Sequence, residues 1–137
     1  MSQVATLLEG PHTFAVVGVS QDVSKYGYEL FEELRAHGHN VLPVNPKYDK
    51  IDKQVCYSSL SALPQVPDAV ITAVPPPAAA RIAQTCAEQN IPVFWMPPGT
   101  ETDEALEICR NNQVTAIHGI CPVFVLKLPR ERWQELP

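Results

Sequence analysis

The residues with the clearest chemical meaning follow the first strongly apolar run of the chain. The run Phe14-Ala15-Val16-Val17 leads into Gly18-Val19-Ser20, and Lys25 and Gly27 follow just before a helical pattern begins. A buried strand, a glycine-bearing loop and a helix N-terminus together leave backbone N–H groups that can donate to an anion such as a phosphate. The stretch therefore predicts an anion-binding loop at residues 18–28, although Gly18 alone is also consistent with a tight turn or close packing.

A second basic residue, Lys47, closes the segment Asn45-Pro46-Lys47 after the next apolar run. An NAD site would instead need G-x-G-x-x-G after the first strand and an acidic residue after the second, and both features are missing here. Lys25 and Lys47 favour a ligand with more than one phosphate. Each lysine alone also fits a solvated surface residue.

His118 and Cys121 form the one cysteine–histidine arrangement that suggests catalysis, because His118 ends the last predicted strand on the ligand side and Cys121 follows three residues later. Such a pair can activate a thiolate. A packed histidine beside a buried thiol is the plainer interpretation, since no third orienting residue can be identified. His37 and His39 flank Gly38, so we place both at the surface or at a helix C-terminus.

The elements that must position these residues alternate along the chain. Apolar runs predict strands at Phe14–Val19, Asn40–Val44, Asp68–Val74, Ile91–Trp95 and Val114–His118, with a short edge or crossover strand at Gln54–Tyr57. Helical patterns cover Tyr28–His37, Ala78–Glu88 and a segment from a capping box at Thr100-x-x-Asp103 through Cys109, with shorter pieces at Thr6–Glu9, Ser58–Leu63 and Glu131–Leu136. Alternation of this kind predicts an α/β fold, a Rossmann-like doubly wound, mostly parallel sheet of about five strands with helices on both faces.

Ligands of such folds bind outside the carboxyl ends of the strands. This rule selects the loops at residues 18–28, 45–48, 74–77, 96–100 and 118–122. In the third loop, Pro75-Pro76-Pro77 either ends a strand and starts a helix, or forms a rigid apolar wall for a ligand.

Composition narrows the class of protein. The 137 residues, 45% of them hydrophobic, predict one domain over residues 1–137. No apolar run approaches the ~20 residues of a membrane span, and no signal sequence is visible, so we expect a cytoplasmic location without membrane association. A net charge of -5 argues against nucleic-acid binding. Four scattered cysteines lack zinc-site spacing, so we expect no metal.

The motifs in order resemble one known family. Gly18-Val19-Ser20, Lys25-Tyr26-Gly27, Val44-Asn45-Pro46-Lys47, Val74-Pro75-Pro76-Pro77 and Phe94-Trp95-Met96-Pro97-Pro98-Gly99 are the segments that carry the resemblance. Together they resemble the small stand-alone CoA-binding proteins, which are similar to the N-terminal CoA-binding domain of the succinyl-CoA synthetase alpha subunit. The resemblance runs from about residue 12 to residue 122, and it implies a Rossmann-like fold with coenzyme A across the strand ends.

The same resemblance implies a set of site residues. The phosphates would face Gly18, Val19, Ser20, Lys25, Tyr26 and Gly27. The 3′-phosphoadenosine end would lie near Asn45, Pro46 and Lys47, and the adenosine or pantetheine would be lined by Val74, Pro75, Met96, Pro97 and Pro98. Two departures stand out: 137 residues are too few for the synthetase's domain with its phosphorylated histidine, and Met96-Pro97-Pro98 replaces a segment that often carries glutamine.

We therefore expect a protein that binds CoA or an acyl-CoA, as a binding module rather than an enzyme. Two alternatives stay open: an enzyme that acts on a CoA thioester through Cys121 and His118, and an NAD(P)-binding regulator. A homodimer is also open, because the apolar run Val123–Leu126 fits either a subunit contact or an internal strand.

Overall fold

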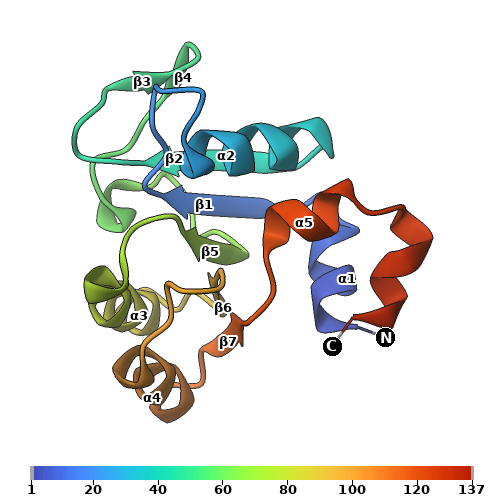
Figure 1. The fold of residues 1–137 in the computed structure, drawn as a ribbon. Helices are drawn as coiled ribbons and strands as arrows, with labels where there is room; N and C mark the ends of the chain where they lie inside the picture. Colours follow the sequence, from blue (N-terminus) through green and yellow to red (C-terminus); the bar gives the residue numbers. More distant parts are fainter. Residues whose placement is uncertain (1, 137) are drawn as a thin grey trace.

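A five-stranded sheet forms the centre of the computed structural model, which describes residues 2–136 (Figure 1). Its strands are β1 (Thr13–Val17), β2 (Asn40–Val44), β5 (Ala69–Thr72), β6 (Val93–Met96) and β7 (Thr115–His118). They lie in the order β2-β1-β5-β6-β7, and every neighbouring pair is parallel. The predicted Rossmann-like, doubly wound α/β fold is confirmed, and the strand order reverses between β1 and β5.

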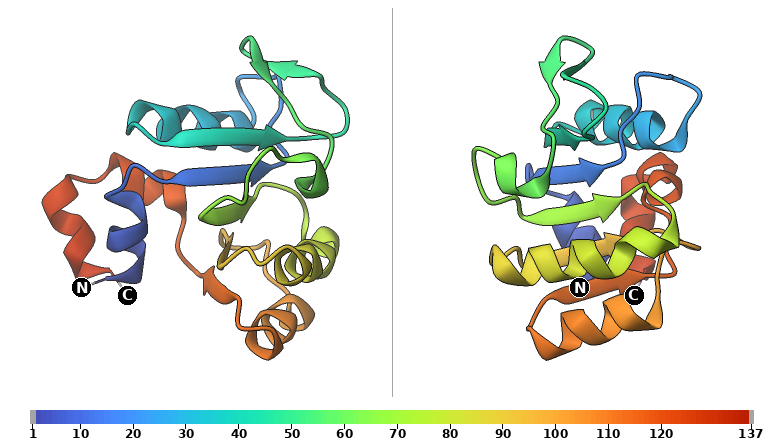
Figure 2. Two further views of the ribbon diagram at one scale, coloured as in Figure 1. Left: turned by 180° about the vertical axis from the view of Figure 1, so that it is seen from behind. Right: turned by 90° about the vertical axis from the view of Figure 1, so that its left-hand side faces the viewer.

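Helices cover both faces of this sheet. One face packs against α1 (Gln3–Leu8), α2 (Tyr26–Ala36), α5 (Pro122–Lys127) and the 3-10 helix η3 (Arg130–Glu135). The other face packs against the 3-10 helices η1 (Leu60–Ala62) and η2 (Pro76–Ala78) and against α3 (Ala79–Glu88) and α4 (Asp103–Asn111). Figure 2 shows α3 and α4 lying side by side.

Burial on both sides explains why the strands read as continuous apolar runs rather than alternating ones. In β1, Phe14 and Val16 enter the core on the α2 side, while Ala15 enters the core on the α3 side. In β6, Trp95 points to the α2 side, where its indole N–H donates to Ile120 O at 2.9 Å. The strands are therefore held in register by two separate apolar layers.

Most predicted elements are found with shifted ends, and β2 is found at its predicted bounds. The helix predicted at Tyr28–His37 begins two residues earlier, at Tyr26. It ends before Gly38, whose φ of +87° is the left-handed conformation expected of a residue after a helix. Asn90 takes the same role after α3, with a φ of +58°.

Two sequence interpretations are wrong, and a third, for His39, is confirmed only in part. The α4 cap is Thr102, whose hydroxyl accepts from Ala105 N, rather than Thr100. Val123–Leu126 is part of helix α5, not a strand, because Pro122 at the first helical position favours a helix start. His39 does lie at the C-terminus of α2, where its N–H donates to Leu34 O at 3.2 Å, but its side chain is only 6% exposed, because its ring lies edge-on against Phe14 at 4.9 Å.

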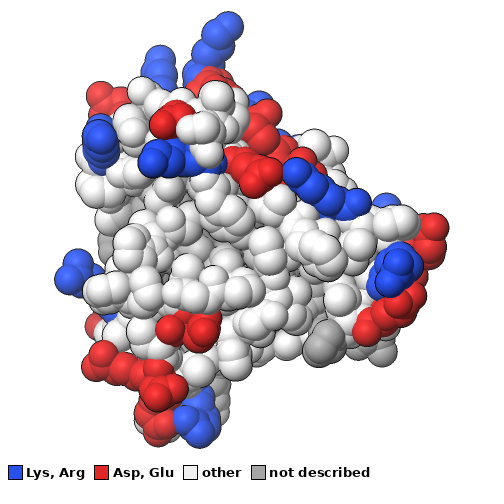
Figure 3. Space-filling model, in the orientation of Figure 1, with Lys and Arg blue, Asp and Glu red and all other residues white. Residues whose placement is uncertain are grey.

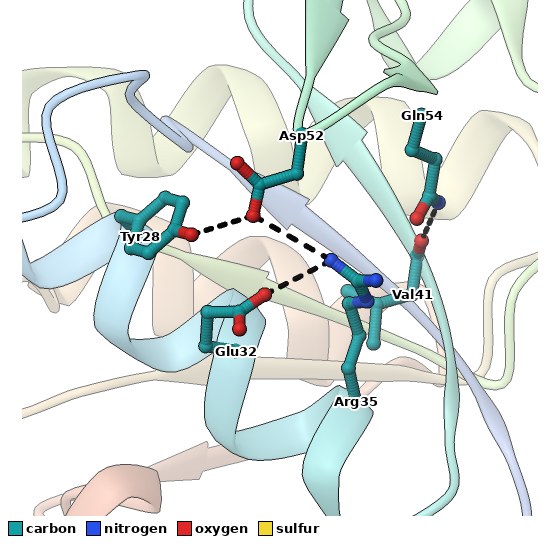
Figure 4. Close-up of polar contacts among 6 residues, drawn as sticks. All are labelled: Tyr28, Glu32, Arg35, Val41, Asp52 and Gln54. Carbon is teal, nitrogen blue, oxygen red and sulfur yellow. Dashed lines mark hydrogen bonds and ion pairs between the residues drawn. The ribbon is translucent and has the colours of Figure 1, made fainter.

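The segment after β2 forms a small antiparallel hairpin of β3 (Lys50–Ile51) and β4 (Gln54–Val55), where a single short strand was expected. Figure 4 shows how it is attached to α2 and β2. The Tyr28 hydroxyl donates to Asp52 at 2.5 Å, and Arg35 Nη1 lies 3.8 Å from the same carboxylate. The Gln54 amide donates to Val41 O. The hairpin is thus fixed beside the loop that follows β1.

The two ends of the described chain lie side by side, as both views show (Figures 1 and 2). Arg130 donates to Glu9 O at 3.1 Å and the Gln134 amide donates to the Glu9 carboxylate at 2.8 Å. Trp133 is 1% exposed and donates to Val125 O. These contacts join η3 to α1 and α5.

The surface in Figure 3 carries Lys and Arg scattered among Asp and Glu, without a continuous basic stripe on that face. Between residues 2 and 136, the helices are too short or too polar to cross a lipid bilayer.

Candidate ligand site at the carboxyl ends of the strands

Gly18, the first residue after β1, is held by both its conformation and its surroundings. Its φ is +100°, and an added Cβ would lie 2.6 Å from Val74 Cγ1. Its N–H donates to Val44 O at 2.8 Å. The close-packing interpretation of Gly18 therefore applies, and this packing brings the loops after β1, β2 and β5 together at the point where the strand order reverses.

The first turn of α2 packs directly on this loop. An added Cβ at Gly27 would lie only 2.4 Å from Gly18 O. Lys25 is the N-cap residue and makes no side-chain cap hydrogen bond. Within residues 2–136, the N–H groups of Tyr26, Gly27 and Tyr28 have no hydrogen-bond partner. Since unpaired first-turn N–H groups carry the positive end of the helix dipole, they are donors for an anion.

The exposed part of the loop is held by its own side chains. Ser20 Oγ accepts from Asp22 N at 2.9 Å and lies 3.4 Å from Tyr48 Oη. The Asp22 carboxylate accepts from the Ser24 hydroxyl at 2.7 Å and from Ser24 N at 3.0 Å. These bonds from Ser24 lower the pKa of Asp22. The Ser20 hydroxyl thus helps to shape the loop.

Asn45 connects the loop after β2 to the loop after β1. Its amide donates to Val19 O at 3.0 Å, and its side-chain oxygen accepts from Lys47 N at 2.9 Å. Val19 is completely buried. Lys47 is exposed, with Nζ 5.6 Å from the centre of the Tyr48 ring. Asn45 is therefore a positioning residue whose amide nitrogen and oxygen each make one hydrogen bond within the protein.

A cavity of about 270 Å³ lies on the α3 side of Gly18. Its walls come from the ends of β1 and β2, from the segment around η1 and from α3; they are Val17, Val44, Pro46, Ser58, Ser59, Leu60, Ser61, Val74, Ala78, Arg81, Ile82 and Thr85. Pro46 and Val74 were predicted site residues. Arg81, in the first turn of α3, was missed; the rule that selects loops after strands would have found it if extended to the helix that follows.

The loop after β6 is less open than its sequence suggests. Met96 is completely buried in the α3-side core, and Pro97 is also buried. Pro97 O accepts from the Thr100 hydroxyl at 2.7 Å. Pro98 and, in the neighbouring loop, Pro75 are exposed. Of these four predicted residues, Pro75 and Pro98 are the ones whose side chains are open to a ligand.

Cys121 lies on the α2 side of the sheet, half-buried at the N-cap of α5. Its Sγ is 3.5 Å from Tyr26 Oη. Burial, and then the contact with Cys121, raise the pKa of the Tyr26 phenol well above its ordinary value, so the phenol stays protonated. His118 is exposed on β7 and makes no hydrogen bond to Cys121 in the described chain. The predicted cysteine–histidine pair is not hydrogen-bonded in this structure.

Comparisons with known proteins identify the family. The family model described as "CoA binding domain" matches residues 12–127. The ADP-forming acetate–CoA ligase II of Archaeoglobus fulgidus is 35% identical over 83 residues, which are 59% of this chain and 12% of the ligase. The uncharacterized protein YneT of Bacillus subtilis is 24% identical over 120 residues, 88% of this chain and 89% of YneT.

Solved structures show the same fold in small proteins. A conserved hypothetical protein from Pyrococcus furiosus superimposes with a TM-score of 0.78 at 33% identity, covering 82% of this chain and 97% of that one. A hypothetical protein from Pyrococcus horikoshii, at 23% identity, has a TM-score of 0.84. The chain spans only 12% to 18% of the acetate–CoA ligases that it matches. With its family model matched over residues 12–127, the chain belongs to the CoA-binding domain family.

Proposed function

We propose that this protein binds coenzyme A or an acyl-CoA at the carboxyl ends of its strands, as a binding module without catalysis of its own. One observation carries the proposal: the uncapped N-terminus of α2 and an apolar cavity lie on opposite sides of Gly18. The first supplies donors for phosphate. The second supplies an apolar space beside those donors, which suits the base of a nucleotide.

Size and charge support a ligand that extends beyond the cavity. A volume of about 270 Å³ is below the roughly 300–1,000 Å³ of typical ligand sites, so it accommodates one part of CoA. Lys25 at the start of α2 adds a positive charge where the phosphates would lie. The exposed Pro75 and Pro98 leave a path along the strand ends for the pantetheine arm.

The surroundings of Cys121 support binding over catalysis. A thioester enzyme that used this thiol would need a base within hydrogen-bond reach. The neighbour of Sγ is instead the Tyr26 phenol, which burial keeps protonated. Ligase activity belongs to relatives of which this chain spans 12% to 18%.

Titration calorimetry of the reduced protein with CoA, acetyl-CoA and NAD tests the proposal. We expect saturable binding of CoA and acetyl-CoA and much weaker binding of NAD. Incubation with acetyl-CoA should release no free CoA. Release of CoA that disappears in Cys121→Ala would instead establish the enzyme, and tight NAD binding without CoA binding would establish the NAD(P)-binding regulator.

Two matched lysine or arginine substitutions test whether the phosphates lie beside Lys25. Lys25→Gln should weaken CoA binding by about tenfold, as expected for loss of one charge-assisted contact. Arg110→Gln, an exposed change in the last turn of α4, removes the same charge away from the site and should have no effect. Equal effects of both variants would show that only overall charge matters.

A further inference from the structure

The cavity beside Gly18 contains one charged residue. Among the described residues, the walls other than the Arg81 guanidinium are apolar or hydroxylic, and none is acidic. Three of the hydroxyls are Ser58, Ser59 and Ser61, from the segment around η1, and Ser61 Oγ accepts from the Gln89 amide at the end of α3 at 2.7 Å. An apolar space with hydroxyls and a single cation suits a ligand group that combines an apolar ring with an anion.

Arg81 is free to bind that anion. Its side chain is exposed and forms no hydrogen bond or ion pair with other residues of the described chain. It lies in the first turn of α3, whose N-cap Ala78 provides no side-chain cap. A guanidinium matches phosphate oxygens with two parallel hydrogen bonds, and the helix start favours the same charge.

The lysine that sequence reasoning assigned to this end of the ligand is less suitable. Lys47 does not line the cavity, and its ammonium group lies 5.6 Å from the centre of the Tyr48 ring. Only Pro46 of the predicted segment Asn45–Lys47 contributes to the cavity wall. The cation nearest to a base in the cavity is therefore Arg81.

We propose that Arg81 determines specificity for the 3′-phosphate of the CoA adenosine, with the adenine ring in the cavity and the guanidinium on the phosphate. This assignment rests on the proposed function. A base alone would fill the apolar part and leave the cation unpaired, whereas a phosphorylated ribose at the mouth of the cavity would reach it. The Ser58 and Ser59 hydroxyls can accept from or donate to the polar edge of the base.

Calorimetry with CoA and dephospho-CoA, on the wild type and three variants, tests this assignment. The wild type should bind CoA about ten- to a hundredfold more tightly than dephospho-CoA, the range for hydrogen bonds between charged groups. Arg81→Gln should lose that preference, because its affinity for CoA falls while its affinity for dephospho-CoA stays the same. Lys47→Gln should keep the preference, and Arg110→Gln, an exposed change on α4, should match the wild type.

Each alternative has its own result. An unchanged CoA preference in Arg81→Gln, or its loss in Lys47→Gln, would overturn the role of Arg81 while leaving CoA binding established. If the cavity holds the acyl chain, affinity will rise with acyl length and Arg81→Gln will not alter the CoA preference. If the wild type binds no CoA form, the proposed function itself fails. Thermal unfolding of Arg81→Gln should match the wild type, since its side chain is exposed.

Discussion

At Gly27, a side chain would have to occupy space next to the backbone of the preceding loop. The added Cβ would lie 2.4 Å from Gly18 O, closer than atoms can pack without movement. Gly27→Ala should therefore push the start of α2 away from the loop. Overpacking costs typically about 1–3 kcal/mol, and the better helix propensity of alanine offsets about 1 kcal/mol of it. We expect a lower urea midpoint and a clear loss of CoA affinity in calorimetry.

Gly38→Ala is the matched control for that variant. Gly38 has a φ of +87° and nothing within 4 Å of an added Cβ, so alanine there meets backbone strain but no neighbour. The cost of a left-handed residue is roughly 1–2 kcal/mol, and CoA affinity should stay at the wild-type value because the residue lies at the far end of α2. Wild-type CoA affinity in Gly27→Ala would show that the loop and helix do not need this close contact to bind the ligand.

Individual residues of the candidate site could be predicted only where residue type and sequence position together restrict the interpretation. Gly18 and Gly27 could be singled out because glycine at a strand–helix junction has few explanations, and both lie where an added Cβ would meet a neighbour. Asn45 could be singled out because it follows a predicted strand, but the hydrogen bonds of its side-chain amide with Val19 O and Lys47 N could not be foreseen. Arg81 was missed, because an arginine in a helix looks like any other surface charge until the fold places it at a cavity.

At the scale of elements, α4 depends on one of two neighbouring threonines. Thr102 Oγ1 accepts from Ala105 N at 3.1 Å, whereas the Thr100 hydroxyl donates to Pro97 O in the turn before the helix. Thr102→Ala should lower the free energy of unfolding by about 1 kcal/mol, the usual cost of a lost N-cap. Urea denaturation measures this difference.

Thr102→Ser keeps the accepting oxygen and should stay near the wild-type stability, which separates capping from other effects of the substitution. A larger loss for Thr100→Ala than for Thr102→Ala would instead return the cap to the position that the sequence favoured. The sequence could not decide between them, because a capping box at Thr100-x-x-Asp103 and a simple cap at Thr102 differ only in where the first turn begins.

The sequence also left the secondary structure of the apolar run in α5 undecided between strand and helix. Val123-Phe124-Val125-Leu126 has the composition of a strand, and a run of four residues is too short for its period to decide. The structure makes it a helix that buries Val123, Val125 and Leu126 and leaves Phe124 62% exposed. Its role is to cover the sheet beside α2, which a sixth strand would not do.

For the molecule as a whole, the order of elements was predictable because the sheet and its covering helices each require a different pattern of apolar residues in the sequence. A parallel sheet buried on two sides requires long apolar runs, and its crossovers require amphipathic helices. The contact between the chain ends was not predictable, since it depends on Arg130 and Gln134 meeting Glu9 from the other end of the chain. The burial of His39 was not predictable either, because it results from β1 and β2 starting side by side in the sheet.

That burial makes the stability of the whole fold depend on pH. His39 Nδ1 accepts from His12 N at 3.1 Å, and the ring packs on Phe14. Burial lowers the pKa of His39, the backbone of Leu8 opposes this, and His12, His37 and Arg130 lower the pKa further. The neutral ring is therefore the form that the folded protein holds, since a proton on Nδ1 would also remove the bond from His12 N.

The sign of the effect follows from the two states. In the unfolded chain His39 takes up its proton near pH 6.5, while the folded protein resists protonation until a lower pH. The unfolded state then binds more protons, so the free energy of unfolding should be constant above about pH 7 and fall as the pH drops below about 6.5. Urea midpoints between pH 7.5 and 5.5 measure this fall before most carboxylates titrate.

Two substitutions assign the fall to its residue. His39→Gln should be less stable than the wild type at pH 7.5, because a packed ring is lost, but its midpoint should change less with pH over the same range. His37→Gln changes an exposed histidine whose ring lies 2.9 Å from Glu33 O, and it should keep most of the wild-type dependence. A wild-type midpoint that stays flat to pH 5.5, or a His39→Gln variant that keeps the full slope, would show that another group controls the acid stability of the sheet.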